Sequence, residues 1–160
     1  MPLTHFSVPS EDRYFEDYAP GAVYEFAETA SLSEAGIIAF ANAFDPQPFH
    51  IDPVKARSSI YKGLIASGAH TIGVTFAILV KCFISERANS GSPGMDEVRW
   101  LKPVRPGDTL RVRATITETK PSRSKKDRGA VSVFVETFNQ RDEIVLSFKV
   151  TYICLKRNQG

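Results

Sequence analysis

An acid and an imidazole lie five residues apart in the segment Asp45-Pro46-Gln47-Pro48-Phe49-His50, directly after an apolar run. Each proline fixes φ at its own position and disfavours helical backbone in the residue before it, which predicts a stiff turn that aims its side chains. A carboxylate and a histidine presented together can orient and activate a water molecule. The alternative is a local role, in which Asp45 caps a turn and His50 begins the next segment, and the hexapeptide alone does not favour either.

Composition indicates one globular domain. A chain of 160 residues buries a core without needing disulfides or a metal, and 42% hydrophobic with 24% charged residues is ordinary for a soluble protein. A formal charge of +2 does not point to nucleic acid as a partner. The basic stretch 120–128, followed by Gly129, is predicted to be a solvated hairpin turn rather than a site for a ligand phosphate.

The two cysteines and the N-terminal residues bear on metal binding and on the cellular compartment. Cys82 and Cys154 lie in apolar segments without CxxC spacing or a nearby histidine, which predicts buried reduced thiols and no metal site. The N-terminus lacks a basic start followed by an apolar stretch, so no signal peptide is expected. The apolar run 71–84 is interrupted by Lys81 and is too short to cross a bilayer. We therefore expect a cytoplasmic protein that does not bind membranes.

Residue spacing changes from helical to strand-like near Met95. A strand is expected at 23–29, a helix at 32–44, a short helix at 53–59 with Asp52 as N-cap, and a long apolar helix at 69–87. Ser31 and Glu34 form a capping-box signature for the first helix, whose apolar positions are Leu32, Ala35, Ile38, Ala39 and Ala43. Strands are expected at 98–104, 109–119, 130–139 and 143–155.

This order of elements predicts an α+β fold with an antiparallel sheet packed on a buried helix. One domain over residues 1–160 accounts for the chain, with residues 1–21 as an extended lead-in.

Three blocks of sequence carry a family resemblance: 44–50 with Asp52 following, 63–68, and 98–109. On these blocks the chain resembles the MaoC-like dehydratase family, which includes the (R)-specific enoyl-CoA hydratases and has the hot dog fold. The resemblance implies a curved antiparallel sheet wrapped around a long central helix at 67–87. It also implies a homodimer with a tunnel for acyl-CoA near the dimer interface, no cofactor, and a role in fatty acid metabolism.

The family's catalytic positions correspond to Asp45, His50 and Gly68. The resemblance implies that Asp45 and His50 bind and activate water for reversible addition to a trans-2-enoyl thioester, giving an (R)-3-hydroxyacyl-CoA. The amide of Gly68, at the start of the central helix, would bind the thioester oxygen. A helix N-terminus has unpaired N–H donors, and negative charge develops on this oxygen as water attacks.

The expected substrate-binding residues are Gln47, Pro48, Phe49, Tyr61, Gly63 and Ser67. Two of them depart from the family pattern, which has Asn in place of Gln47 and His in place of Ser67, so the identity of the acyl group is open. His70 either compensates for the absent histidine or is a helix residue satisfied by a neighbouring group. Trp100 is expected to pack in the core or an interface.

Two other functions fit the same fold. One is a non-catalytic acyl-CoA-binding protein, which would bind thioesters tightly without turnover. The other is an acyl-CoA thioesterase, which would release a free thiol. The hydratase reading is preferred because an acid and a histidine presented together suit water activation, and a binding module does not need them.

Overall fold

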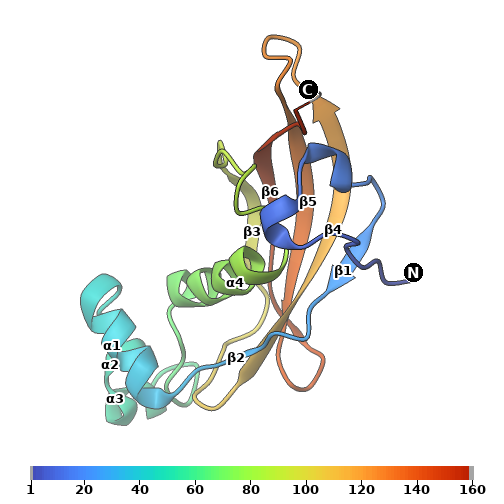
Figure 1. The fold of residues 1–160 in the computed structure, drawn as a ribbon. Coiled ribbons are helices and arrows are strands. Elements are labelled where there is room, and N and C mark those ends of the chain that lie inside the picture. Colours follow the sequence, from blue (N-terminus) through green and yellow to red (C-terminus); the bar gives the residue numbers. More distant parts are fainter. Residues whose placement is uncertain (1, 159–160) are drawn as a thin grey trace.

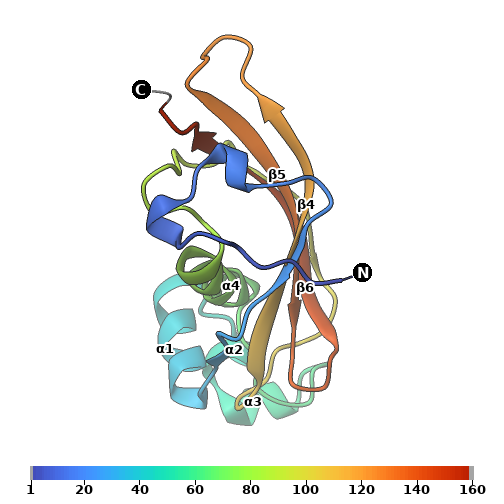
Figure 2. The same cartoon turned by 45° about the vertical axis from the view of Figure 1, so that its right-hand side comes forward.

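Six strands form a curved antiparallel sheet, and a helix of 15 residues lies across its concave face (Figures 1 and 2). This computed structural model describes residues 2–158. The main sheet has the strand order β1-β4-β5-β6-β3, and β2 pairs with β4 beside this path. The strands are β1 (Val23–Glu25), β2 (Ala30–Ser31), β3 (Met95–Trp100), β4 (Thr109–Pro121), β5 (Arg128–Phe138) and β6 (Ile144–Leu155).

The long strands form because their residues alternate between core and solvent with a period of two. On β4, Leu110 and Val112 are fully buried, whereas Arg111 between them lies on the outer face of the sheet. The same alternation continues through β5 and β6, so the inner face is a continuous apolar layer. The prediction of an α+β fold with an antiparallel sheet around a central helix is confirmed.

The central helix, α4 (Gly68–Cys82), packs one face on the sheet through Thr71, Thr75, Ile78 and Leu79. It is shorter than the expected helix at 69–87. The guanidinium of Arg13 donates to the carbonyl oxygens of Cys82 and Phe83 at 3.1 and 2.8 Å, and thereby satisfies carbonyls at the end of the helix. The other face of α4 is exposed, so the helix is not enclosed on every side within the single chain.

Three helices precede α4 and gather at one end of the sheet: α1 (Glu34–Phe44), α2 (Pro48–Ile51) and α3 (Pro53–Arg57) (Figure 1). The N-cap of α1 is Ser33, whose side chain accepts from the Gly36 amide at 3.0 Å. The expected capping role of Ser31 is therefore wrong, since Ser31 belongs to β2. Asp52 does cap α3, with Pro53 as the first helical residue, as predicted.

The buried face of α1 also differs from expectation. Ile37 and Ala41 point into the core, whereas Ala35, Ala39 and Ala43 are exposed. Alanines fit either face of a helix, so their spacing did not identify the inner one.

Residues 2–21 are held against the rest of the fold. Two short 3-10 turns, η1 (Ser10–Asp12) and η2 (Phe15–Asp17), interrupt an otherwise extended path. Phe15 and Tyr18 are buried, and the Tyr18 hydroxyl donates to the Phe83 carbonyl at 2.8 Å. This segment therefore covers the C-terminal end of α4. Of the strand expected at 23–29, only 23–25 forms, as β1, and β2 follows just beyond the expected range.

Other sequence expectations can be checked directly. Residues 122–127 form the projecting turn between β4 and β5, as predicted (Figure 2). Cys154 is buried, and burial raises the pKa of its thiol to about 12. Cys82 is only half-buried, which corrects the expectation for that thiol. None of the helices in the described part of the chain has the length and apolarity needed to cross a membrane.

Candidate active site

The acid and the imidazole of the opening hexapeptide meet in the structure. Asp45 is the C-cap of α1, and His50 is the third residue of α2, which begins at Pro48. The fixed φ of a proline suits the first position of a helix, so α2 begins at Pro48, directly after its N-cap Gln47. His50 Nε2 lies 3.3 Å from Asp45 Oδ2. The hexapeptide is therefore a helix end followed by a helical turn, and it places the two side chains in contact.

The His50 ring has a defined protonation at one nitrogen. Nδ1 lies 2.8 Å from the carbonyl oxygen of Ile65. A carbonyl only accepts hydrogen bonds, so Nδ1 carries a proton and Nε2 is the nitrogen that can take up and release one. The ring is buried and packs edge-on against Phe49, with centroids 4.5 Å apart. This arrangement presents Nε2 toward Asp45.

The two positions that depart from the family pattern both contact Asp45. The Gln47 side-chain amide donates to Oδ1 at 2.7 Å, and the Ser67 hydroxyl donates to Oδ2 at 2.7 Å. These hydrogen bonds, Gln47 first and Ser67 second, lower the pKa of the Asp45 carboxyl, and nearby His50 lowers it further. Hydrogen bonds to a carboxylate favour its charged form. Asp45 is thus held ionised and oriented at neutral pH.

These groups line a cavity of about 830 Å³. Asp45, His50 and Ser67 lie on its wall, as do Phe49 and Tyr61, whose rings are 5.3 Å apart. Asp45 and Lys102 are the charged lining groups apart from the histidine. The remaining lining residues are mostly apolar or small: Phe44, Gln47, Ile65, Ala66, Gly68, Ala69, Thr71, Ile72, Trp100, Leu101, Pro103, Val104 and Val145.

Gly68 is the first residue of α4 and lies at the cavity beside the acid and the histidine. Its amide is at a position that has no acceptor within the helix. Ser67 is the N-cap, and its oxygen accepts from the Ala69 amide at 3.3 Å. Ser67 therefore links the start of α4 to Asp45. The three residues with expected catalytic roles, Asp45, His50 and Gly68, line one cavity.

Not every expected residue lines this cavity. Pro48 and Gly63 are absent from its wall. Pro48 acts on the backbone at the start of α2, and Gly63 lies beside the Arg105 guanidinium, which donates to the Tyr61 carbonyl at 2.6 Å. His70 also lies outside the wall: its ring stacks on Phe40 at 4.5 Å, and burial lowers its pKa. Among residues 2–158 its Nδ1 has no hydrogen-bond partner, so neither sequence reading describes it.

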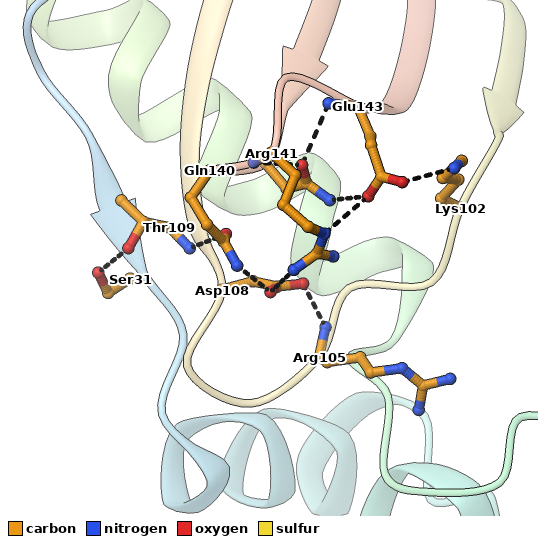
Figure 3. Close-up of polar contacts among 9 residues, drawn as sticks. Ser31, Lys102, Arg105, Asp108, Thr109, Gln140, Arg141 and Glu143 are labelled. Atoms are coloured by element: carbon orange, nitrogen blue, oxygen red, sulfur yellow. Dashed lines mark hydrogen bonds and ion pairs between the residues drawn. The ribbon is translucent and has the colours of Figure 1, made fainter.

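A polar network fixes the β3–β4 loop that forms one wall of the cavity (Figure 3). Glu143 accepts from Lys102 Nζ at 2.6 Å and from Asn139 at 2.7 Å. Buried Asp108 accepts from the Arg105 amide at 2.9 Å and from the Gln140 side chain at 2.8 Å. The turn between β5 and β6 therefore holds both ends of this loop in place.

The hydrogen bonds from Asn139, Lys102 and Arg141 lower the pKa of Glu143 to about 2. We call Glu143 with Asn139, Lys102 and Arg141 the Glu143 clamp. Sequence reasoning did not identify it, because its members belong to two separate connections between strands. In the described part of the chain, no three His, Cys, Asp or Glu side chains gather closely enough to hold a metal ion.

Comparison with known proteins identifies the family. The model of the MaoC like domain matches residues 16–137. The chain belongs to the MaoC-like family. Solved structures with this architecture include one described as a double hot dog fold, and the resemblance in fold and family is confirmed.

Individual MaoC-like relatives carry names that concern hydration. A mesaconyl-CoA hydratase of Cereibacter sphaeroides is 43% identical over 149 residues, which is 91% of this chain but 42% of that protein. An (R)-specific enoyl-CoA hydratase of Rhodospirillum rubrum is 30% identical over 117 residues, covering 69% of this chain and 74% of the relative. The crystal structure of a MaoC-like dehydratase from Rhodospirillum rubrum aligns with a TM-score of 0.82 at 37% identity, over 91% of this chain and 99% of that one.

Proposed function

We propose that the protein adds water reversibly to a trans-2-enoyl-CoA, giving an (R)-3-hydroxyacyl-CoA, with Asp45, His50 and Gly68 as the catalytic residues. The observation that carries the proposal is the 3.3 Å contact between Asp45 and His50 at a cavity that also contains the start of α4. Membership of the MaoC-like family and the names of the two hydratase relatives support the same reaction.

Each residue has a role that follows from its surroundings. The ionised Asp45 takes a proton from water while the water oxygen bonds to the β-carbon, and the electron pair of the double bond moves toward the thioester oxygen. The Gly68 amide donates to that oxygen as its charge grows. The proton taken by Asp45 passes across the short gap to His50 Nε2, which delivers it to the α-carbon, so that both side chains return to their starting states. The net change is the addition of one water.

The experiment is a hydratase assay that follows loss of the conjugated enoyl thioester, with chiral analysis of the product. Asp45→Asn keeps the size of the side chain and removes the base, so kcat should fall by about 10²–10⁴-fold. His50→Gln should cause a comparable loss because an amide cannot take up and release a proton as the imidazole does. An Asp45→Asn protein as active as the parent would remove the assigned mechanism.

The same samples separate the two alternative functions. A thioesterase would release free CoA thiol in step with substrate loss, whereas hydration leaves the thioester intact. A non-catalytic binding protein would bind butyryl-CoA and crotonyl-CoA but consume neither. Either result would replace the hydratase proposal.

A substrate whose acyl group carries a free carboxylate is a further candidate, because the alignment with the mesaconyl-CoA hydratase covers 91% of this chain. Among the residues that line the cavity in the described part of the chain, Lys102 is the one lysine, and none is an arginine. Its ammonium group forms an ion pair with Glu143. Comparing kcat/KM for crotonyl-CoA and mesaconyl-CoA, in the parent and in Lys102→Met, would decide. Loss of activity confined to mesaconyl-CoA would assign the lysine to the acyl carboxylate.

The proposal includes a homodimer. Ala69, Gly73, Ala77 and Val80 form an exposed small and apolar face on α4, and β3 is the outer strand of the sheet. Both surfaces suit a second copy of the chain, because exposed apolar faces and unpaired strand edges favour association. Light scattering after gel filtration should give a mass near twice 17.7 kDa. A monomeric mass at micromolar concentration would contradict the dimer.

A further inference from the structure

Trp100 places its indole directly over the start of α4. A Cβ atom added to Gly68 would lie 2.5 Å from Trp100 Nε1 and 2.6 Å from Cε2. The contact is therefore made by the edge of the indole that carries its N–H group. The residue is 56% exposed and also lines the cavity. The space above Gly68, which the sequence assigned to a substrate carbonyl, is thus shared with this ring.

Two N–H donors meet at this point without acceptors. The Gly68 amide is the first of α4, and within residues 2–158 neither this amide nor Trp100 Nε1 makes a hydrogen bond. An indole N–H only donates, so it cannot be satisfied by a second donor beside it. An acceptor oxygen that reaches both groups would satisfy both.

The position of Trp100 is set by contacts on both sides of the cavity. The next residue, Leu101, donates from its amide to the Val145 carbonyl at 2.9 Å, and the Ala66 amide donates to the Val104 carbonyl at 2.8 Å. The Lys102–Glu143 ion pair fixes the same loop (Figure 3). Both the strand that ends at Trp100 and the segment that leads into Gly68 are therefore anchored to one loop, so the backbone of Trp100 is held in register with the helix start.

We propose that the indole N–H of Trp100 is a second hydrogen-bond donor, beside the Gly68 amide, to the thioester oxygen. This inference rests on the proposed hydratase function. As water adds to the β-carbon, an electron pair moves onto the thioester oxygen, and a second donor aimed at that oxygen lowers the energy of the charged species more than that of the substrate. Trp100 is on this proposal a catalytic residue, supplied by the β-sheet rather than by the helices.

The kinetic test is Trp100→Phe, which keeps an aromatic ring over Gly68 and removes the N–H. With crotonyl-CoA, kcat should fall by about tenfold to a thousandfold, as expected for loss of one oxyanion donor, with a much smaller change in KM. An unchanged thermal midpoint would show that the fold is intact. A variant with the parental kcat would overturn the proposal.

A direct test uses the fact that Trp100 is the only tryptophan of the chain, so the protein has one indole N–H resonance. The ¹⁵N-labelled protein is titrated with butyryl-CoA and with S-butyl-CoA, a thioether of equal chain length that lacks the carbonyl. The indole proton should move downfield with the thioester and not with the thioether. Equal shifts with both ligands, or no shift with bound thioester, would overturn the role of Trp100.

The outcomes also separate this inference from the function on which it rests. If the parent hydrates crotonyl-CoA and Asp45→Asn does not, but Trp100→Phe is fully active, only the role of the indole fails. If the parent hydrates no enoyl-CoA, the hydratase function fails, and with it the catalytic role of the indole. A downfield shift with butyryl-CoA alone would then still show that the N–H recognises the carbonyl.

Discussion

The Ser67 hydroxyl donates to Asp45 Oδ2 across 2.7 Å and thereby joins the N-cap of α4 to the C-cap of α1. This hydrogen bond links two helix ends that are 22 residues apart in the sequence, at the wall of the cavity. The same oxygen faces His50 Nε2, so the geometry of the proposed catalytic pair depends on this bond.

Removing the hydrogen bonds to Asp45 should change the pH dependence of activity. Because Gln47 and Ser67 lower the pKa of Asp45, Gln47→Met and Ser67→Ala should each raise it. In the proposed mechanism Asp45 acts as the carboxylate. Activity should therefore disappear as pH falls through its pKa, and the acidic limb of kcat/KM should move to higher pH. Gln47→Met should produce the larger shift. Ser67→Thr, which keeps a hydroxyl, is the matched control, and an unmoved limb in both variants would refute this account.

Gly68→Ala tests the contact between the helix start and Trp100. The new methyl group would lie 2.5 Å from the indole nitrogen, so the exposed ring must move away. Alanine favours helix more than glycine does, so stability should change by less than about 1 kcal/mol while kcat falls at least tenfold. In a Trp100→Phe background the same substitution should cost less activity, because the indole donor is already absent. If the two losses in kcat simply multiply, so that their activation free energies add, the two residues are not coupled.

The Glu143 clamp predicts a loss of stability in acid. The folded-state pKa of about 2 lies below the ordinary value of 4.5, so the folded protein binds fewer protons between these values than the unfolded chain. The contribution of Glu143 is therefore fully present above the ordinary value and declines as pH falls toward about 2. Thermal unfolding of the parent and of Glu143→Gln should show a gap in Tm at about pH 6 that narrows by about pH 3. A gap that stays constant with pH would argue against the clamp.

The cap of α1 can be tested by stability alone. Ser33→Ala removes the side-chain acceptor of the Gly36 amide and should lower the free energy of unfolding by about 1 kcal/mol. Ser33→Asp keeps an acceptor and should retain most of the parental stability. Urea unfolding of the two variants provides the measurement. An Ala variant as stable as the parent would show that the helix does not depend on this cap.

The sequence predicted the fold well because its strongest signals are local. Alternating apolar residues in β4 to β6 and the Asp52–Pro53 start of α3 depend only on neighbours a few positions away. The C-terminal end of α4 was missed because Arg13, 69 residues earlier than the carbonyl of Cys82, caps it. The choice between Ser31 and Ser33 as N-cap could not be made from residue type, since both are serines close to the helix start.

The same distinction applies to the candidate site. The pairing of Asp45 with His50 was visible because a short proline-containing segment carries both residues. The indole of Trp100 over Gly68, and the hydrogen bond from Ser67 to Asp45, depend on how distant segments pack. Sequence spacing gives no measure of such contacts, so these two features appeared only in the structure.

Two chain segments supply most of the cavity wall, and this division has an evolutionary consequence. Residues 45–68 supply Asp45, His50 and the Gly68 amide, whereas Leu101 to Val104 belong to the separate loop between β3 and β4. On the proposed function, substitutions in that loop can alter which acyl groups are accepted while the segment that transfers protons is inherited unchanged. Exchanging the loop between MaoC-like relatives should therefore transfer substrate preference, and the two segments can diversify at different rates within one fold.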